Sequence, residues 1–145
     1  DYFTPQMKGL RADLKLLDSL LAKYVPKLHA HMLEHNLDLC VLTMSWFLCI
    51  FLTTLPAREA HRVLDCFLAE GSVVLFRMAL SIIEARSAEL LAISSLPEAY
   101  LLLRWPCEGQ AEGVNIDVPN VRPVSSEHLF ESMYGSWLAD LSEDE

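Results

Sequence analysis

Residues 39–57 read LCVLTMSWFLCIFLTTLPA, a run of 19 residues without one charged side chain. Roughly 18 apolar residues in a row are enough to span a membrane. This run, however, contains polar residues and a proline, namely Thr43, Ser45, Thr53, Thr54 and Pro56. Without its polar ends, a helix of about 12 residues around Trp46 remains, apolar on all sides, which is typical of a helix at the centre of a core. We therefore predict a core helix within 42–54 and no membrane span.

Two amphipathic helices are expected before this run. Thr4 can cap the first and Pro5 fits its first position. Its apolar face recurs at spacings of four, three and four residues, at Leu10, Leu14, Leu17 and Leu21. Pro26 opens a second, shorter helix that ends near Asn36. The apolar residues of this second helix are Leu28, Met32 and Leu33.

Two further helices are expected after the run. Pro56 opens the first, and Gly71 ends it because glycine adopts the left-handed cap conformation without a steric penalty. Its inner face is Ala60, Val63, Leu64, Phe67 and Leu68, and its outer face carries Glu59, Arg62 and Asp65. Ser72 can cap the second helix, over 73–84, which should be buried apart from a polar stripe of Arg77 and Ser81.

The last third of the chain is less regular. The string Ser95-Leu96-Pro97-Glu98 fits a capping box and opens a short helix that ends near Leu103. Residues 104–124 are rich in proline and glycine, which predicts a loop or linker. Ser125 opens a last helix before a frayed acidic end at 141–145, and one face of that helix carries Leu129, Phe130, Met133 and Trp137. No segment alternates with a period of two, so the expected fold class is all-α, an irregular helical bundle.

The composition favours a folded protein that does not bind nucleic acid. Of the 145 residues, 52% are hydrophobic, enough for a large core. Residues 1–92 carry 9 basic and 10 acidic side chains, whereas residues 93–145 carry 2 and 10, as in a solvated acidic tail. Such an end repels the phosphates of nucleic acids and of acidic membranes. The chain begins at Asp1 without an apolar leader, so we expect a piece of a longer chain with no signal peptide here.

The four cysteines indicate free thiols. They are Cys40, Cys49, Cys66 and Cys107, and none forms a Cys-x-x-Cys pair. The first three have apolar neighbours, where a free cysteine behaves as a small buried hydrophobic residue. A chain with this much core has little need of a disulfide framework, so we expect a reducing, cytoplasmic location.

One string is similar to a zinc-binding motif. His31 and His35 lie four residues apart on one helix face with Glu34 beside them, as in the His-x-x-Glu-His pattern. A zinc hydrolase is therefore a remote alternative, for which the sequence offers no third ligand. The simpler interpretation is a polar helix end, with His35 near the last carbonyls. Because nucleophile elbows and phosphate-binding glycine loops are also absent, no catalytic residue, cofactor or metal is expected.

A series of strings in the apolar helices carries a family resemblance. The strings are Trp46-Phe47-Leu48-Cys49-Ile50-Phe51, Leu55-Pro56, Arg62-Val63-Leu64-Asp65, the five residues 67–71 and the seven residues 74–80, with Asp13-Leu14-Lys15 and Val25-Pro26-Lys27-Leu28 upstream. In this order they resemble the TBC domain, the fold of Rab GTPase-activating proteins, over about residues 2–92. Leu64 departs from the tryptophan frequent at its position. The resemblance assigns structural motif positions to Trp46, Phe47, Phe51, Arg62, Asp65, Gly71, Phe76 and Arg77.

The resemblance implies a domain division and a mechanism. It implies the C-terminal lobe of a TBC domain over 1–103, then the loop or linker at 104–124, and a C-terminal helix with an acidic tail over 125–145. TBC domains accelerate GTP hydrolysis by inserting an arginine and a glutamine into the Rab site. In the family these residues lie in Ile-x-x-Asp-x-x-Arg and Tyr-x-Gln strings, and neither string occurs here. Arg62 and Arg77 fit structural positions instead, so we expect a GTPase activator, not an enzyme, whose finger residues lie outside this chain.

The expected partners follow from the same resemblance. They are a GTP-bound Rab-type GTPase and the N-terminal lobe of the same domain, in the cytoplasm and at endomembrane surfaces. The chief alternative is a TBC-like interaction scaffold without working fingers. Because the helices at 42–54 and 73–84 are apolar nearly all round, a half-domain should expose an apolar face larger than the few hundred Å² usual for a monomer.

Overall fold

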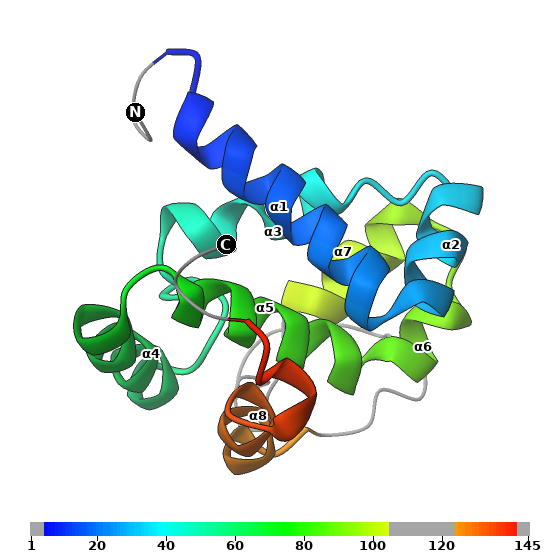
Figure 1. The fold of residues 1–145 in the computed structure, drawn as a ribbon. Coiled ribbons are helices and arrows are strands. Elements are labelled where there is room, and N and C mark those ends of the chain that lie inside the picture. Colours follow the sequence, from blue (N-terminus) through cyan, green and yellow to red (C-terminus); the bar gives the residue numbers. More distant parts are fainter. Residues whose placement is uncertain (1–4, 105–123, 142–145) are drawn as a thin grey trace.

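The computed structural model describes residues 5–104 and 124–141 (Figure 1). These residues form helices joined by short turns and contain no strand, which confirms the all-α fold class. In chain order the elements are α1 (Lys8–Tyr24), α2 (Pro26–Glu34), α3 (Leu39–Leu48), α4 (Ala57–Glu70), α5 (Val73–Ala85), α6 (Ser87–Leu91), α7 (Leu96–Arg104), α8 (Ser126–Met133) and the 3-10 turn η1 (Ser136–Leu138).

Helix α5 lies at the centre of the bundle. Helix α1 crosses it diagonally, and α3, α4, α6 and α8 contact it from other sides (Figure 1). Every residue from 73 to 83 except Arg77 is buried, so the prediction of a buried helix is confirmed. Ser81 is a correction, because it is buried with the apolar residues instead of lying on a polar stripe. Ser72 occupies the N-cap position, but its side chain makes no capping hydrogen bond.

Helix α1 begins later than predicted. Pro5 and Gln6 form a turn, and Met7 adopts a left-handed backbone with φ of 44°. A left-handed residue cannot continue a right-handed helix, so the helix begins at Lys8. Thr4 lies outside the described residues. The predicted leucine face is confirmed, since Leu10, Leu14, Leu17 and Leu21 are all buried.

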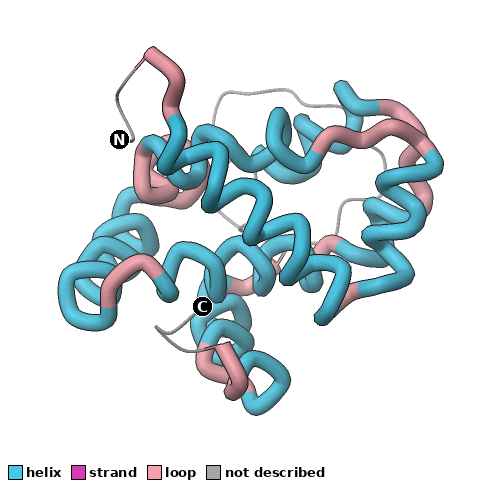
Figure 2. Tube along the Cα trace, turned by 45° about the horizontal axis from the view of Figure 1, so that its top comes forward, coloured by secondary structure: helices cyan, strands magenta, loops and turns pink. Residues whose placement is uncertain are grey.

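Helix α2 folds back against α1 and also contacts α6, a short helix that the sequence analysis did not predict. Figure 2 shows this antiparallel return of the chain. Leu28 and Met32 are buried as expected, but Leu33 is 65% exposed. It lies about 100° around the helix from Met32, outside the narrow stripe that faces α1.

The apolar run at 39–57 forms a shorter helix than predicted. Helix α3 ends at Leu48, and Ile50 and Phe51 then take φ values of 48° and 61°. The Phe51 amide donates to the Trp46 carbonyl at 3.0 Å, and the two rings lie 5.5 Å apart, both buried. The reversal therefore returns the Phe51 side chain to the core, at the expense of the helix that we expected to continue to residue 54.

Helix α3 is also not buried on all sides. Val41 is 50% exposed, Met44 39% and Leu52, in the following turn, 52%. No element among the described residues covers these three side chains, so the prediction of an all-round buried helix is wrong for α3. The search for spanning helices, limited to the described part of the chain, found none long and apolar enough to cross a membrane.

Helix α4 ends at Gly71 as predicted, with φ of 81° at the glycine. Its contact face with α5 is narrower than the sequence suggested, because it is centred on Ala60 and Val63. Leu68, expected on the inner face, is 75% exposed, and Glu59, expected outside, is buried. The cysteines Cys40, Cys49 and Cys66 are likewise half-buried instead of fully buried.

The C-terminal part packs onto the same core. Helix α7 has the predicted bounds within one residue, and the Glu98 amide approaches the Ser95 hydroxyl at 3.5 Å. Leu129, Phe130 and Met133 of α8 are buried, whereas Trp137 lies beyond the helix in η1. Leu141 is buried and not part of a frayed end. The predicted loop over 105–123 and the acidic residues 142–145 lie outside the described residues.

Candidate functional site

Four of the predicted motif residues form an aromatic cluster between α3 and α5. Trp46, Phe47, Phe51 and Phe76 are all buried. The rings of Phe47 and Phe76 lie 5.2 Å apart at an angle of 60°, a tilted arrangement that aromatic pairs favour. The cluster fixes the inner face of α3 against the central helix.

Arg62 of α4 reaches the last helix. Its Nη1 donates to a carboxylate oxygen of Glu127 at 3.0 Å, and its guanidinium lies 3.9 Å from the centre of the Phe130 ring. A cation over an aromatic face is attracted by the ring quadrupole. Asp65, three residues on, is exposed. Arg62 therefore connects α4 to α8 across 65 residues of sequence.

Arg77 makes a second connection to the C-terminal segment, which we define as residues 124–141. Its Nη1 donates to Glu70 at 3.3 Å, and its Nη2 donates to the Leu141 carbonyl at 2.7 Å. The turn at Gly71 brings Glu70 next to Arg77. An arginine finger must project into a partner's nucleotide site, whereas both motif arginines here are committed to contacts within the chain.

The C-terminal segment also contacts α1. The Trp137 ring meets the Tyr24 ring edge-on at 5.9 Å, and its Nε1 donates to the Ser132 carbonyl at 3.0 Å. A Cβ at Gly135 would lie 2.9 Å from Trp137 Cδ1, so the indole needs a glycine there. The sequence analysis missed this arrangement because no local pattern relates Arg62, Arg77 and Tyr24 to residues beyond 124.

The histidines of the predicted zinc string are engaged otherwise. His31 Nε2 donates to the Ile93 carbonyl at 2.8 Å, and the His31 and His35 rings lie 4.4 Å apart. Across residues 5–104 and 124–141, no group of three or more His, Cys, Asp or Glu side chains is placed to hold a metal ion. The string thus serves to join α2 to the chain after α6.

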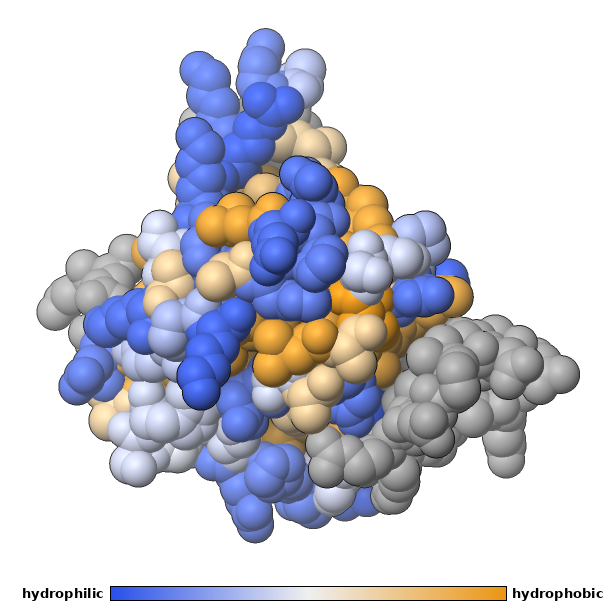
Figure 3. All heavy atoms as spheres, turned by 90° about the vertical axis from the view of Figure 1, so that its right-hand side faces the viewer, coloured by the Kyte–Doolittle hydropathy of each residue, from blue (hydrophilic) through white to orange (hydrophobic). Residues whose placement is uncertain are grey.

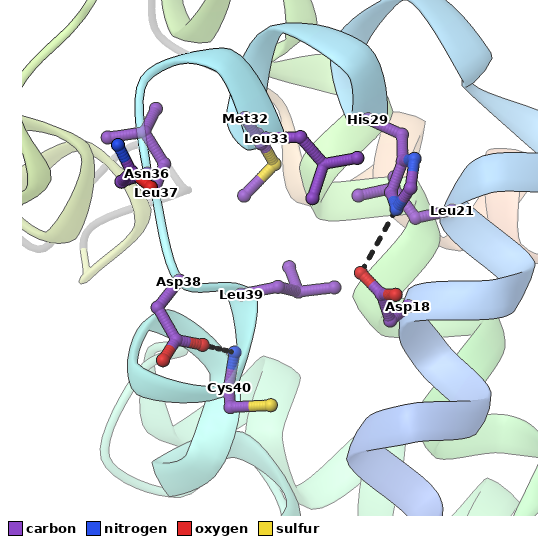
Figure 4. A pocket seen from close by; sticks show the side chains of 10 residues that line it. All are labelled: Asp18, Leu21, His29, Met32, Leu33, Asn36, Leu37, Asp38, Leu39 and Cys40. Carbon is purple, nitrogen blue, oxygen red and sulfur yellow. Dashed lines mark hydrogen bonds and ion pairs between the residues drawn. The ribbon is translucent and has the colours of Figure 1, made fainter.

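An open hollow of about 470 Å³ lies between α1, α2 and the start of α3 (Figure 4). Its floor is apolar, and two ion or hydrogen-bond pairs stand at its edge. His29 Nε2 lies 3.2 Å from Asp18 Oδ1, and Asp38 Oδ1 accepts from the Cys40 amide at 2.9 Å, as the cap of α3. Burial, then the nearby Asp38 charge, raises the pKa of Cys40. A thiol with a raised pKa is a poor nucleophile, so the hollow lacks the chemistry of a catalytic site.

Two exposed apolar areas remain on the surface. The first is the α3 strip, which we define as Val41, Met44 and Leu52. The second lies on the side that carries α2 and α6, where Figure 3 shows apolar atoms gathered between polar groups. The exposed leucines of these two helices are Leu33 and Leu91. Contiguous apolar surface of this kind marks interaction sites more often than isolated residues do.

Comparison with known proteins gives matches of one kind. The sequence model of the family described as Rab-GTPase-TBC domain matches residues 1–91. TBC1 domain family member 2A from Homo sapiens is 36% identical over 105 residues, which cover 72% of this chain and 11% of that protein. Growth hormone-regulated TBC protein 1 from Xenopus tropicalis is 34% identical over 98 residues, 68% of this chain and 29% of that protein.

A third relative is the TBC1 domain family member whacked from Drosophila melanogaster. It is 38% identical over 111 residues, which cover 74% of this chain and 31% of that protein. The chain thus spans less than a third of the length of each of these curated relatives. No solved structure matches it.

Proposed function

This chain belongs to the Rab-GTPase-TBC domain family, and on that premise we propose that it is the C-terminal lobe of a GTPase-activating domain for Rab-type GTPases. In this proposal the lobe supports the N-terminal lobe and adds contacts to the GTP-bound Rab. The arginine and glutamine that act on GTP lie in the N-terminal lobe. The chain is then a regulator of a GTPase and not itself an enzyme.

The observation that carries the proposal is the α3 strip. Val41 and Met44 lie three residues apart on one face of α3, and Leu52 follows in the next turn. Burying an apolar side chain of this size is worth about 1.5–3 kcal/mol. The opposite face of α3 is held by Trp46 and Phe47, so the strip is presented on a fixed support. We propose the N-terminal lobe as its occupant.

The placement of the arginines supports the division of labour. Neither finger string occurs in the sequence, and Arg62 and Arg77 are bound to the C-terminal segment. Stimulating hydrolysis through either one would require breaking those contacts. An arginine supplied in trans contributes about 10³–10⁵ in rate, so its presence or absence is readily measured.

The first experiment supplies the N-terminal lobe of the same protein as a separate chain. We expect no stimulation of hydrolysis by this chain alone across a panel of GTP-loaded Rab proteins, and stimulation by the two chains together. A stimulated rate with this chain alone would overturn the assignment of the fingers to the other lobe. A complex that binds Rab proteins but stimulates none would favour the interaction scaffold.

The second experiment tests the strip itself. Met44→Asp should weaken binding of the N-terminal lobe, measured by calorimetry or light scattering. Leu68→Asp is the matched control, because it introduces the same charge at a 75% exposed apolar residue away from the strip. Equal affinity in both variants, or a monomer that melts cooperatively and does not bind the other lobe, would contradict the proposal.

A further inference from the structure

Tyr134 stands where the C-terminal segment meets α4 and α5. It caps the end of α8 and is 50% exposed. Its hydroxyl donates to the Glu70 carboxylate, and its ring lies 5.9 Å from the Arg77 guanidinium. Burial raises the pKa of Tyr134, and hydrogen bonds with Cys66 and Glu70 raise it further, so the hydroxyl keeps its proton.

The other tyrosines lack this combination. The Tyr24 hydroxyl is buried, and Tyr100 lies within α7. Tyr2 is outside the described residues. Tyr134 combines an accessible side chain, a position at a helix end and a hydroxyl bound into a charged pair, so a change at its oxygen would act directly on the contacts that hold the C-terminal segment.

We propose that Tyr134 is a phosphorylation site, and that its phosphorylation loosens the C-terminal segment from α4 and α5. The donor is ATP and the catalyst a protein tyrosine kinase. The Tyr134 hydroxyl oxygen forms a bond to the γ-phosphorus, the bond from that phosphorus to the ADP oxygen breaks, and the hydroxyl proton passes to a base of the kinase. The product is a tyrosine phosphate monoester together with ADP.

The direction of the effect follows from the charges around the hydroxyl. At present Glu70 and Arg77 balance each other, and Tyr134 donates a proton to the same carboxylate. A phosphotyrosine oxygen has no proton to donate and brings about −1.5 to −2 charges at pH 7. Glu70 and the phosphate then repel each other and compete for Arg77.

The competition reaches the end of the segment. Arg77 Nη2 now donates to the Leu141 carbonyl at 2.7 Å. A phosphate dianion is a stronger acceptor for arginine than a neutral carbonyl, so Arg77 turns toward the phosphate and releases Leu141. The cluster keeps one cation against two anionic groups, which leaves it less stable than before.

The test uses the full-length protein that carries these residues. Treatment with a tyrosine kinase and ATP, followed by peptide mass spectrometry, shows whether the folded protein accepts phosphate at Tyr134. Protein with phosphotyrosine incorporated genetically at that position is then compared with unmodified protein by hydrogen exchange. We expect amides of residues 126–141 to exchange about tenfold faster, and those of α1 to change little.

A charge-removing variant separates repulsion from mere bulk. In Glu70→Gln the carboxylate charge is gone, so phosphorylation should accelerate exchange of residues 126–141 by much less than in wild type. Tyr134→Phe, which cannot be phosphorylated, is the control for the lost hydrogen bond. Failure of the folded protein to accept phosphate, unchanged or slower exchange after phosphorylation, or an equal effect in Glu70→Gln would each overturn the proposal.

Discussion

Helices α3 and α5 are both apolar along almost their whole length, yet their surroundings differ. Every residue of α5 from 73 to 83 except Arg77 is buried, under α1, α3, α4, α6 and α8. Helix α3 buries Trp46 and Phe47 on one side and exposes Val41 and Met44 on the other. An apolar sequence therefore shows that a helix will be covered, but not whether the same chain provides the cover.

The origin of the cover differs as well. Part of the cover of α5 comes from α8, which lies beyond residues 1–91 that match the family. The exposed side of α3 lies inside the matched region, and among the described residues nothing packs on it. If the proposal for the N-terminal lobe is correct, the two helices are equally buried in the whole domain. Four predictions separate these cases.

The largest effect is expected inside the aromatic cluster. Trp46→Ala should lower the free energy of unfolding by about 3–5 kcal/mol, because Trp46 is 1% exposed and its removal leaves a cavity. Chemical denaturation of the whole domain measures the change. A variant as stable as wild type would mean that the inner face of α3 is no better packed than its outer face.

The all-round burial of α5 can be tested at two opposite positions. Leu80 and Ile82 lie about 200° apart around the helix and are both fully buried. Leu80→Ala and Ile82→Ala should each lower the stability by about 2–5 kcal/mol. A loss confined to one of them would show that α5, like α3, has a side on which packing matters little.

A smaller effect is expected at the polar residue of α5. Arg77→Leu removes the hydrogen bonds to Glu70 and Leu141, and bonds made by a charged group are worth about 1.5–3 kcal/mol in total or singly. Thermal melting should show the loss, and limited proteolysis should cut near residue 141 more readily. Arg58→Leu, at an exposed arginine of α4, is the control that should leave both unchanged.

The smallest effect on stability is expected on the outer face of α3. Met44→Asp should change the free energy of unfolding of this chain by less than about 0.5 kcal/mol, as is usual for exposed positions. In the whole domain the same substitution should be clearly destabilising. Comparing the two melting curves sharpens the contrast with α5, and equal small changes in both would remove the reason to expect a covering lobe.

Sequence periodicity predicted the elements whose signals are local. The leucine face of α1, the end of α4 at Gly71 and the extent of α5 rest on spacing and on one glycine. The strings around Trp46 indicated the family, which the comparisons confirm. The site residues as a set stay a prediction, although the structure places their aromatic members in one buried cluster.

The rest depended on packing between distant residues. A β-branched residue such as Ile50 rarely adopts positive φ, so nothing in the sequence pointed to the reversal that ends α3. The pairing of Arg62 with Glu127 joins residues 65 positions apart, and no local pattern encodes it. The exposure of Met44 could not be predicted because it depends on what lies beside α3 in space.

The docking of the C-terminal segment on α5 also has a kinetic consequence. Residues 126–133 meet a helix that ends at Ala85, so the contact closes a long loop, and such contacts form late because the chain entropy is lost before they are gained. Changes at late-forming contacts act mainly on the unfolding rate and little on the folding rate. The last helix of this chain therefore sets how long the folded lobe persists, rather than how quickly it forms.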